Sequence, residues 1–302
     1  MSLPARTPRT PGPGPAPRTP GQASTPRVLT IAGSDSGGGA GIQADLKAFA
    51  RCGVHGMSAI TAITAQNTLG VEAVHAIPPE IVRAQVRAVL FDIGVDAVKV
   101  GMLGSAPTVR VVAAVLDELP ADTPVVVDPV MVSESGARLL DPDAEGALVA
   151  EILPRATILT PNMPEARALV GGSPAGDVSD SERDEASALV RAVLALGPKI
   201  VVLTGGHREQ ATDLFLDSES PERIVSIPGK RHAEGAAHGS GCTHSSVLAA
   251  QLALGRAPLQ AAFAARAFTG EAVARGLRDI GQGPGPVDAI GLARVRAEPG
   301  LS

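Results

Sequence analysis

The residues with the clearest chemical potential form one short run, Gly239-Ser240-Gly241-Cys242-Thr243, ahead of a long helix rich in Ala and Leu. Two glycines and small hydroxyl residues at a helix start leave main-chain amides pointing outward, so the run predicts an anion hole. A thiol in that positive potential is expected to have a lowered pKa. We therefore predict that Cys242 takes a proton from a substrate hydroxyl while the amides hold a transferring phosphoryl group. Alternatively, Cys242 is a small buried hydrophobe.

Two carboxylates are candidates for a magnesium site. Glu165 stands three residues after Asn162, between a predicted strand and a predicted helix, and this spacing fits a capping box that explains both residues structurally. In the functional interpretation, Glu165 binds a hydrated Mg²⁺, an ion that takes few carboxylates. Asp128 is the candidate for a second carboxylate beside the phosphates. The run 204–206, Thr-Gly-Gly, ends another predicted strand, and Thr204 and Gly206 are expected to let a nucleotide approach the main chain.

Three further segments are candidates for substrate contacts. The glycine-rich run that starts at Gly33 precedes a predicted helix carrying Asp45, and by itself it is a weak phosphate signal or a structural turn. Gln66 offers one acceptor and two donors, which suits the edge of an aminopyrimidine-like ring, although a turn residue bonded to its own main chain fits equally well. Met102 has a flexible, polarizable side chain that covers a flat ring or fills a core.

The composition excludes several classes of protein. Of 302 residues, 44% are hydrophobic and 2% are aromatic, with a net charge of −5, so neither a nucleic-acid surface nor an anionic-membrane surface is expected. No apolar run reaches the roughly 18 to 20 residues of a membrane helix. The two cysteines, Cys52 and Cys242, make neither a disulfide framework nor a metal motif. These features predict a soluble protein of a reducing compartment, placed in the cytoplasm.

The positioning elements belong to one predicted domain, 28–302, behind a tail. The tail, 1–27, contains eight prolines and four arginines without an acidic residue, and we expect it to be disordered. From residue 28 onward, β-branched apolar runs alternate with helical patterns, which predicts an α/β fold, a three-layer α/β/α sandwich with a mostly parallel central sheet. Ligands bind such sheets at the carboxyl ends of the strands, where the candidate residues above are found. The predicted strands are 28–32, 57–65, 71–77, 95–101, 123–129, 157–161, 199–205 and 211–217, and the predicted helices are 40–51, 79–92, 106–118, 141–152, 164–170, 181–196, 243–254 and 258–276.

Seven motifs, taken in order, resemble one enzyme family, the hydroxymethylpyrimidine/phosphomethylpyrimidine kinases of thiamine biosynthesis, which belong to the ribokinase-like superfamily. The likeness runs from about residue 28 to about residue 285. It implies a ribokinase-like sandwich, usually a homodimer, that phosphorylates hydroxymethylpyrimidine and then its monophosphate from ATP with Mg²⁺. The motifs are AGSDSGGGAGIQADLK, TAITAQNTLGV, KVGMLG, VVVDPVM, ILTPNMPEA, VVLTGGH and HGSGCTHSS.

The resemblance also implies roles for individual residues. Gln66 is expected to contact the pyrimidine amino group and ring nitrogen, Asp45 to lie near the hydroxymethyl group, and Met102 to line the ring pocket. The run 239–243 is expected to form the anion hole, with Cys242 at the position where many ribokinase-like enzymes have an aspartate base. Asn162 and Glu165 are expected to position Mg²⁺. One departure is His244, which replaces a leucine and could place a titrating group near the phosphate.

Three other functions remain open from the sequence. A pyridoxal kinase shares the fold, the anion hole and the cysteine. A non-catalytic pyrimidine-binding protein would keep the pocket without turnover. A cysteine hydrolase would use Cys242 with His238 or His244 as its base.

Overall fold

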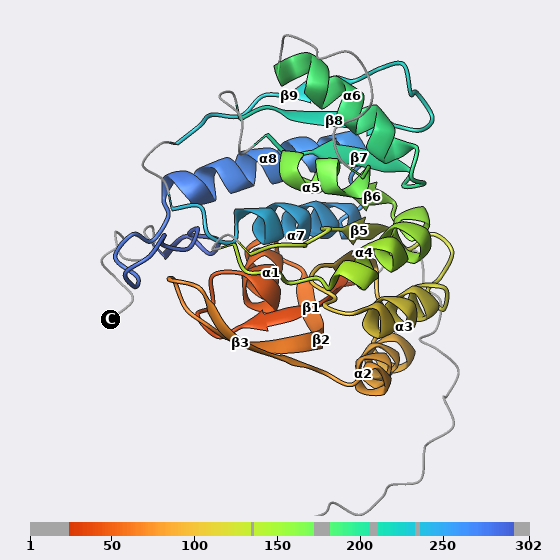
Figure 1. Cartoon of the computed structure of the whole chain (residues 1–302), viewed down its shortest axis with the longest axis vertical. Coiled ribbons are helices and arrows are strands. Elements are labelled where there is room, and N and C mark those ends of the chain that lie inside the picture. Colours follow the sequence, from red (N-terminus) through yellow and green to blue (C-terminus); the bar gives the residue numbers. More distant parts are fainter. Residues whose placement is uncertain (1–23, 134–135, 172–181, 206–210, 233–235, 293–302) are drawn as a thin grey trace, which may run out of the picture.

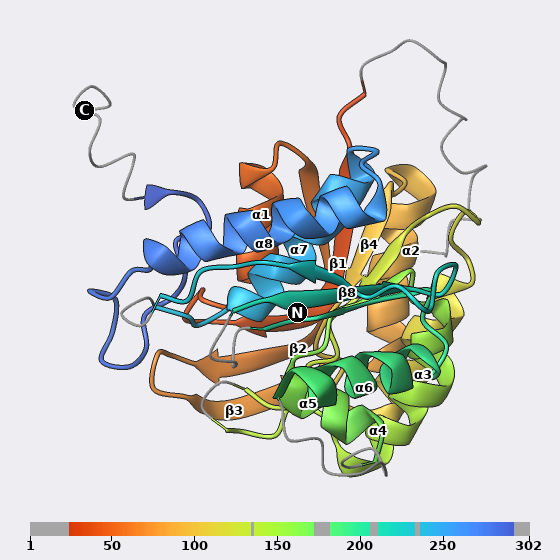
Figure 2. The ribbon, with the colours of Figure 1, turned by 90° about the horizontal axis from the view of Figure 1, so that it is seen from above.

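The computed structural model describes residues 24–133, 136–171, 182–205, 211–232 and 236–292, and these form a central sheet covered by helices on both faces (Figures 1 and 2). The sheet has nine strands in the order β3-β2-β1-β4-β5-β6-β7-β8-β9. The neighbours from β2 to β7 pair in parallel, whereas β3, β8 and β9 pair antiparallel at the two edges. The predicted α/β sandwich with a mostly parallel sheet is therefore confirmed.

The strands are β1 (Arg27–Asp35), β2 (His55–Gln66), β3 (Val71–Ala76), β4 (Ala97–Val100), β5 (Val125–Val127), β6 (Ile158–Leu159), β7 (Ile200–Leu203), β8 (Asp213–Asp217) and β9 (Val225–Ile227). The helices are α1 (Gly41–Arg51), α2 (Pro79–Asp92), α3 (Ala106–Leu116), α4 (Pro142–Ala147), α5 (Met163–Leu169), α6 (Glu182–Leu194), α7 (Ser240–Ala253) and α8 (Pro258–Ala274). A π-helical turn (Leu148–Ile152) and a 3-10 turn (Leu153–Arg155) extend α4.

Two apolar cores hold the layers together because alternate residues of each buried strand face opposite sides of the sheet. In β4, Val98 and Val100 pack into the core beneath α2, α3 and α6, whereas Ala97 packs into the core beneath α1, α7 and α8. Figure 2 shows α7 and α8 on one side of the strands and α5 and α6 on the other. Lys99 points to the same side as Ala97, toward α1 and α7, where an apolar residue would be expected.

The strand order places a topological switch point beside β1. β2 pairs with one edge of β1 and β4 pairs with the other, so the chain passes from β1 through α1 to one side and returns from β3 through α2 to the other side. Ligands of open α/β sheets bind in the crevice at such a point. The glycine-rich run after β1 and the Gly101–Met102 turn after β4 both lie at this place.

The differences from the predicted elements have local causes. Arg27, assigned to the tail from the sequence, begins β1, because its guanidinium and main-chain amide bind the Asp96 carboxylate at 3.0 and 2.8 Å. β9 has only three residues, too few for a period-2 pattern to be recognised. Residues 1–23 of the predicted tail lie outside the described part of the chain. None of the described helices is long and apolar enough to cross a membrane.

Candidate active site

One cavity of about 480 Å³ opens at the carboxyl ends of the parallel strands and gathers most of the predicted site residues. The residues come from seven separate segments of the chain. Six of them lie in or just after the parallel strands, which end at the same edge of the sheet, and the seventh is the start of α7. Two predicted residues are missing from the lining: Asp45, which is buried beneath it, and Gly206, which lies outside the described residues. The predicted residues that line the cavity are Gly33, Gln66, Met102, Asp128, Asn162, Glu165, Thr204, Gly239, Ser240, Gly241 and Cys242.

The start of α7 has the geometry of an anion hole. Gly239 is the N-cap of this helix, with φ of +79°, a left-handed conformation that strongly favours glycine. Ser240, Gly241 and Cys242 form the first turn. The Ser240 amide donates to the Ala237 carbonyl oxygen at 2.9 Å, whereas the amides of Gly241 and Cys242 have no partner inside the helix. All four residues line the cavity, so the positive end of the α7 dipole faces it.

The floor of the cavity contains a buried ammonium group. Lys99 is completely inaccessible to solvent, and its Nζ lies 3.1 Å from both carboxylate oxygens of Asp45 and 3.9 Å from Oδ2 of Asp128. Burial alone would lower the pKa of Lys99, but the charges of Asp45, Cys242 and Asp128 outweigh it and raise the pKa. Lys99 is therefore a permanent cation at the base of the site.

Asp45 does not have the position expected from the sequence. It is fully buried and absent from the cavity lining, and Thr30 and Ser246 donate hydrogen bonds of 2.6 and 2.7 Å to its carboxylate. Together with Lys99 these contacts occupy both oxygens. We therefore correct the expected contact with the substrate hydroxymethyl group: Asp45 holds the lysine from below.

Cys242 lines the cavity, as predicted, but its protonation differs from the prediction. Burial raises the pKa of the Cys242 thiol to about 12, and the lowering by Lys99 is offset by Asp128 and Asp45. The sequence argument considered the helix dipole and could not include desolvation or the two carboxylates. The expected thiolate near neutral pH is thus replaced by a protonated thiol.

Asp128 and Glu165 form a pair of carboxyl groups that fits a hydrated divalent cation. Burial and the neighbouring Asp128 raise the pKa of Glu165 to about 8, and burial also raises the pKa of Asp128 against the opposing effect of Lys99. A carboxyl group whose pKa is raised by a neighbouring carboxylate favours a cation beside it, and Mg²⁺ needs only one or two protein carboxylates because waters and phosphates complete its shell. Among the described residues there is no cluster of three or more His, Cys, Asp or Glu with metal-site geometry.

Glu165 also completes the predicted capping box. Its Oε2 accepts a hydrogen bond from the Asn162 amide at 2.9 Å, and Asn162 Oδ1 accepts one from the Glu165 amide at 2.9 Å. The capping interpretation is therefore confirmed. It involves one carboxylate oxygen of Glu165, and both residues still line the cavity.

The opposite end of the cavity has the residues expected to hold a ring. Gln66 ends β2, and its Oε1 accepts a hydrogen bond of 3.1 Å from Thr64, which fixes the orientation of the amide. Met102 lies beside Gly33, where an added Cβ would come within 2.9 Å of the Met102 sulfur. This glycine therefore leaves the space that the methionine occupies along the wall.

Thr204 lies at the rim of the cavity and His244 does not. Behind Thr204, the Gly205 amide donates to Asp213 Oδ1 at 2.8 Å. His244 is buried on the far side of the α7 helix, with Nε2 3.4 Å from Asp213 Oδ2, and it is absent from the cavity lining. The expectation that His244 could stand near the phosphate is therefore wrong, and His244 cannot serve as a hydrolase base there.

Two charged cavity residues, Asp35 and Lys99, were missed by the sequence analysis, which considered His238 only as a possible hydrolase base. The signal for Lys99 was present, because a single charge inside the apolar strand run VDAVKVG must be buried and paired. Asp35 and His238 are 203 residues apart, and only the folded chain shows that they meet.

Comparison with known proteins identifies the family of this chain. The family model for phosphomethylpyrimidine kinase matches residues 35–288, which include the predicted cavity residues other than Gly33. The chain belongs to the phosphomethylpyrimidine kinase family. The hydroxymethylpyrimidine/phosphomethylpyrimidine kinase of Rhizobium meliloti is 47% identical over 263 residues, covering 86% of this chain and 95% of the relative. A bifunctional thiamine biosynthesis protein of Geobacter sulfurreducens is 44% identical, covering 87% of this chain and 52% of that protein.

Solved structures related to the family include kinases for two vitamins. The pyridoxal kinase of Staphylococcus aureus, in complex with AMP-PCP and pyridoxal, has a TM-score of 0.78 and 32% identity, covering 90% of this chain and 96% of that one. The phosphomethylpyrimidine kinase of Clostridium difficile has a TM-score of 0.70 and 39% identity, covering 82% of this chain and all of that one. These likenesses confirm the ribokinase-like fold.

The raised pKa of Cys242 predicts slow alkylation. In a Cys52→Ser background, iodoacetamide should label Cys242 more slowly than free cysteine at every pH from about 6 to 9, because a thiol with a pKa near 12 has little thiolate in that range. Mass spectrometry of the labelled peptide gives the rate. An apparent pKa below that of free cysteine would contradict the burial argument and restore the original prediction.

The raised pKa of Glu165 predicts a stability difference that grows with pH. Because the folded protein favours the neutral carboxyl, wild-type stability is lost as pH rises from the ordinary glutamate pKa toward about 8. The variant Glu165→Gln keeps the cap but cannot ionise, so its Tm should exceed that of wild type by more at about pH 8.5 than at about pH 5.

Thermal unfolding without divalent cations measures this difference, and Glu222→Gln at an exposed position is the matched control. A Tm difference between Glu165→Gln and wild type that stays constant with pH would show that the Glu165 pKa is not raised.

Proposed function

We propose that this chain is a phosphotransferase that transfers the γ-phosphoryl group of ATP to hydroxymethylpyrimidine and then to its monophosphate. These are the two acceptors in the names of its relatives, one of which is a thiamine biosynthesis protein. One observation carries the proposal: a single cavity joins the Gln66 and Met102 wall to the anion hole of α7 and the two carboxyl groups. A ring held at one end would present its alcohol to a phosphoryl group held at the other. Proximity of this kind supplies much of the catalysis of group transfer.

The pyrimidine is proposed to bind against Gln66, Met102 and Gly33. The Gln66 amide presents donors and an acceptor to the amino group and ring nitrogen of an aminopyrimidine, and Thr64 fixes its orientation. The thioether of Met102 covers the ring face. The apolar side chains of Val130, Met131 and Leu139 line the same cavity and exclude water from it.

ATP is proposed to bind from the Thr204 side, with Asn162, Thr204 and Gly206 near the nucleotide. Mg²⁺, when bound, would neutralise phosphate charge, and Asp128 and Glu165 are the residues that would hold it. The support for ATP is that relatives of this fold have been solved with AMP-PCP and with ADP. The amides of Gly239, Gly241 and Cys242 then hold the transferring group, with the Ser240 side chain beside them because its own amide donates to Ala237.

In-line transfer through a loose transition state depends mainly on positioning and electrostatics. The α7 amides and the Lys99 ammonium supply positive potential where negative charge accumulates on the phosphoryl oxygens. Cys242 is proposed to accept the hydroxyl proton late, in its thiolate form. A pKa of about 12 makes that form a small fraction at neutral pH, and the neighbouring Lys99 favours it over a thiol buried alone.

Pyridoxal is the second candidate acceptor, because a pyridoxal kinase solved with pyridoxal matches this fold with a TM-score of 0.78. The non-catalytic alternative would leave the anion hole and the paired carboxyl groups without a role. The hydrolase alternative needs a thiol of low pKa, and burial moves the pKa of Cys242 in the opposite direction.

A cytoplasmic homodimer is proposed for the assembled enzyme. The support is the edge ribbon of β2 and β3, which leaves Ile63 and Val74 about half exposed and Leu69 more so. Apolar side chains gathered on an edge strand are typical of a surface that another chain covers.

The decisive assay measures ADP release with hydroxymethylpyrimidine, its monophosphate and pyridoxal as acceptors. Both pyrimidines should be turned over with higher kcat/KM than pyridoxal. Gln66→Ala should raise the KM for the pyrimidine by about tenfold, because one or two hydrogen bonds to the ring are lost. Binding without ADP release would support a non-catalytic protein, and a preference for pyridoxal would support the second candidate.

A further inference from the structure

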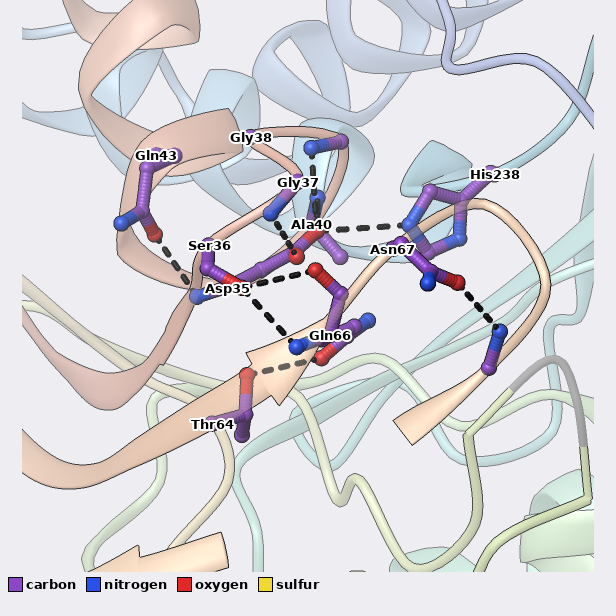
Figure 3. Close-up of polar contacts among 12 residues, drawn as sticks. Asp35, Ser36, Gly37, Gly38, Ala40, Gln43, Thr64, Gln66, Asn67 and His238 are labelled. Atoms are coloured by element: carbon purple, nitrogen blue, oxygen red, sulfur yellow. Dashed lines mark hydrogen bonds and ion pairs between the residues drawn. The ribbon is translucent and has the colours of Figure 1, made fainter. Parts of the chain in front are cut away.

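The carboxylate of Asp35 occupies the amides of the glycine-rich run that follows β1. It accepts hydrogen bonds from the amides of Gly37 at 2.8 Å, Gly39 at 2.9 Å and Ala40 at 2.8 Å. Figure 3 shows Gly37 and Ala40 around this side chain. Exposed amides in a glycine-rich turn predict a phosphate site, but these three amides already bind an anion from their own loop. The run therefore has a task other than holding phosphate.

The same carboxylate reaches the start of the anion hole. His238 Nε2 lies 3.3 Å from Asp35 Oδ2, and His238 directly precedes Gly239, the N-cap of α7. The main chain of the glycine-rich run also packs directly against His238 and Gly239. A Cβ added to Gly39 would lie 2.3 Å from the His238 ring, and one added to Gly239 would lie 1.8 Å from the Gly39 carbonyl oxygen. The position of the Asp35 loop thus fixes where α7 begins.

The next residue, Ser36, reaches the opposite end of the cavity. Its hydroxyl donates to the main-chain carbonyl oxygen of Gln66 at 2.7 Å and accepts from the main-chain amide of Gln66 at 2.8 Å. Both main-chain groups of Gln66 are therefore held by one hydroxyl. A Cβ on Gly37 would lie 3.3 Å from the same carbonyl, so the loop and the end of β2 are packed closely.

Contacts with helix α1 hold the loop that carries Asp35 and Ser36 in place between the two ends of the cavity. Gln43 accepts from the Asp35 amide at 2.9 Å and donates to the Ser34 hydroxyl at 2.8 Å. Lys47 donates to the Gly38 carbonyl oxygen at 2.6 Å. Burial alone would raise the pKa of Asp35, but hydrogen bonds from His238, Ala40 and Gly37 outweigh it and lower the pKa, so the carboxylate keeps its charge.

We propose that Asp35 and Ser36 are positioning residues with separate targets. Ser36 holds the main chain of Gln66 and so positions its side-chain amide for the acceptor ring. Asp35, through His238, positions the anion hole for the transferring phosphoryl group. Neither residue needs to contact a reacting atom for this task. The proposal rests on the proposed function, because it assigns the two ends of the cavity to ring binding and phosphoryl transfer.

The proposal predicts that two adjacent substitutions have separable effects. Ser36→Ala should weaken equilibrium binding of hydroxymethylpyrimidine, measured calorimetrically without ATP, by about fivefold or more while leaving kcat at saturation nearly unchanged. Asp35→Asn should lower kcat by about tenfold or more while pyrimidine affinity stays within about twofold of wild type, because misplacement at the phosphoryl end affects the transition state.

Further variants separate positioning from simple loss of structure. Ser36→Thr keeps the hydroxyl and should restore pyrimidine affinity. His238→Gln should lower kcat like Asp35→Asn, and the double variant should lose little more than either single one because both act through one contact. If Asp35→Asn does not fold, His238→Gln carries this arm alone. Controls remote from the cavity are Ser226→Ala in β9 and Asp217→Asn, whose carboxylate accepts from the Glu219 amide at 2.9 Å.

The outcomes also distinguish this proposal from the proposed function. Wild type that releases no ADP with either pyrimidine would reject the proposed function. If wild type is active but each of Ser36→Ala and Asp35→Asn lowers both pyrimidine affinity and kcat, the separate positioning roles are overturned. They are also overturned if neither variant changes either quantity.

Discussion

The site depends on one buried ion pair and its neighbours. Lys99 stands in the middle of the sheet, inaccessible to solvent, with Asp45 below it and Asp128 beside it. A lysine in this place is costly unless it is paired and hydrogen-bonded, and the same holds for the two carboxylates. Since β1, β4, the end of β5, α1 and α7 each contribute a group to this network, the network fixes how the strands and the two helices meet under the cavity.

The network also explains the chemistry of the cavity above it. Asp128 Oδ2 accepts a hydrogen bond from Ser245 at 3.0 Å and lies 3.9 Å from Lys99 Nζ, and the charge of Asp128 raises the pKa of Glu165. Dehydration, the condition that strengthens electrostatic interactions with a phosphoryl group, also keeps the Cys242 thiol protonated. The proposed phosphate site, with its buried dipoles and ammonium group, therefore does not provide a ready thiolate as well. The geometry favours catalysis by positioning over catalysis by a strong base.

Sequence reasoning succeeded where the chemistry is local. The apolar runs of β1, β4 and β7 predicted buried parallel strands, and the spacing of Asn162 and Glu165 predicted their reciprocal cap. Residues at the carboxyl ends of strands, such as Gln66 and Met102, were expected at a common edge because parallel strands end together.

It failed where a property depends on what surrounds a residue. Asp45 was expected to face the substrate, but its environment is set by Thr30, Lys99 and Ser246, which are distant along the chain. The pKa of Cys242 was predicted from the helix dipole alone. Desolvation and two neighbouring carboxylates, which decide its direction, appear only when the chain is folded. The loop of Asp35 was left open between a weak phosphate signal and a structural turn, because the carboxylate that binds its amides could not be placed from the sequence.

The most direct test of this account is the free energy of unfolding of Lys99→Met and of the double variant Lys99→Met/Asp45→Asn, measured by equilibrium urea denaturation. Removing the ammonium leaves Asp45 buried without its counter-charge, so the single variant should lose about 3 to 5 kcal/mol, and neutralising Asp45 should restore most of that loss. A single variant as stable as wild type, or a double variant no better than the single, would contradict the claim that this buried pair organises the site.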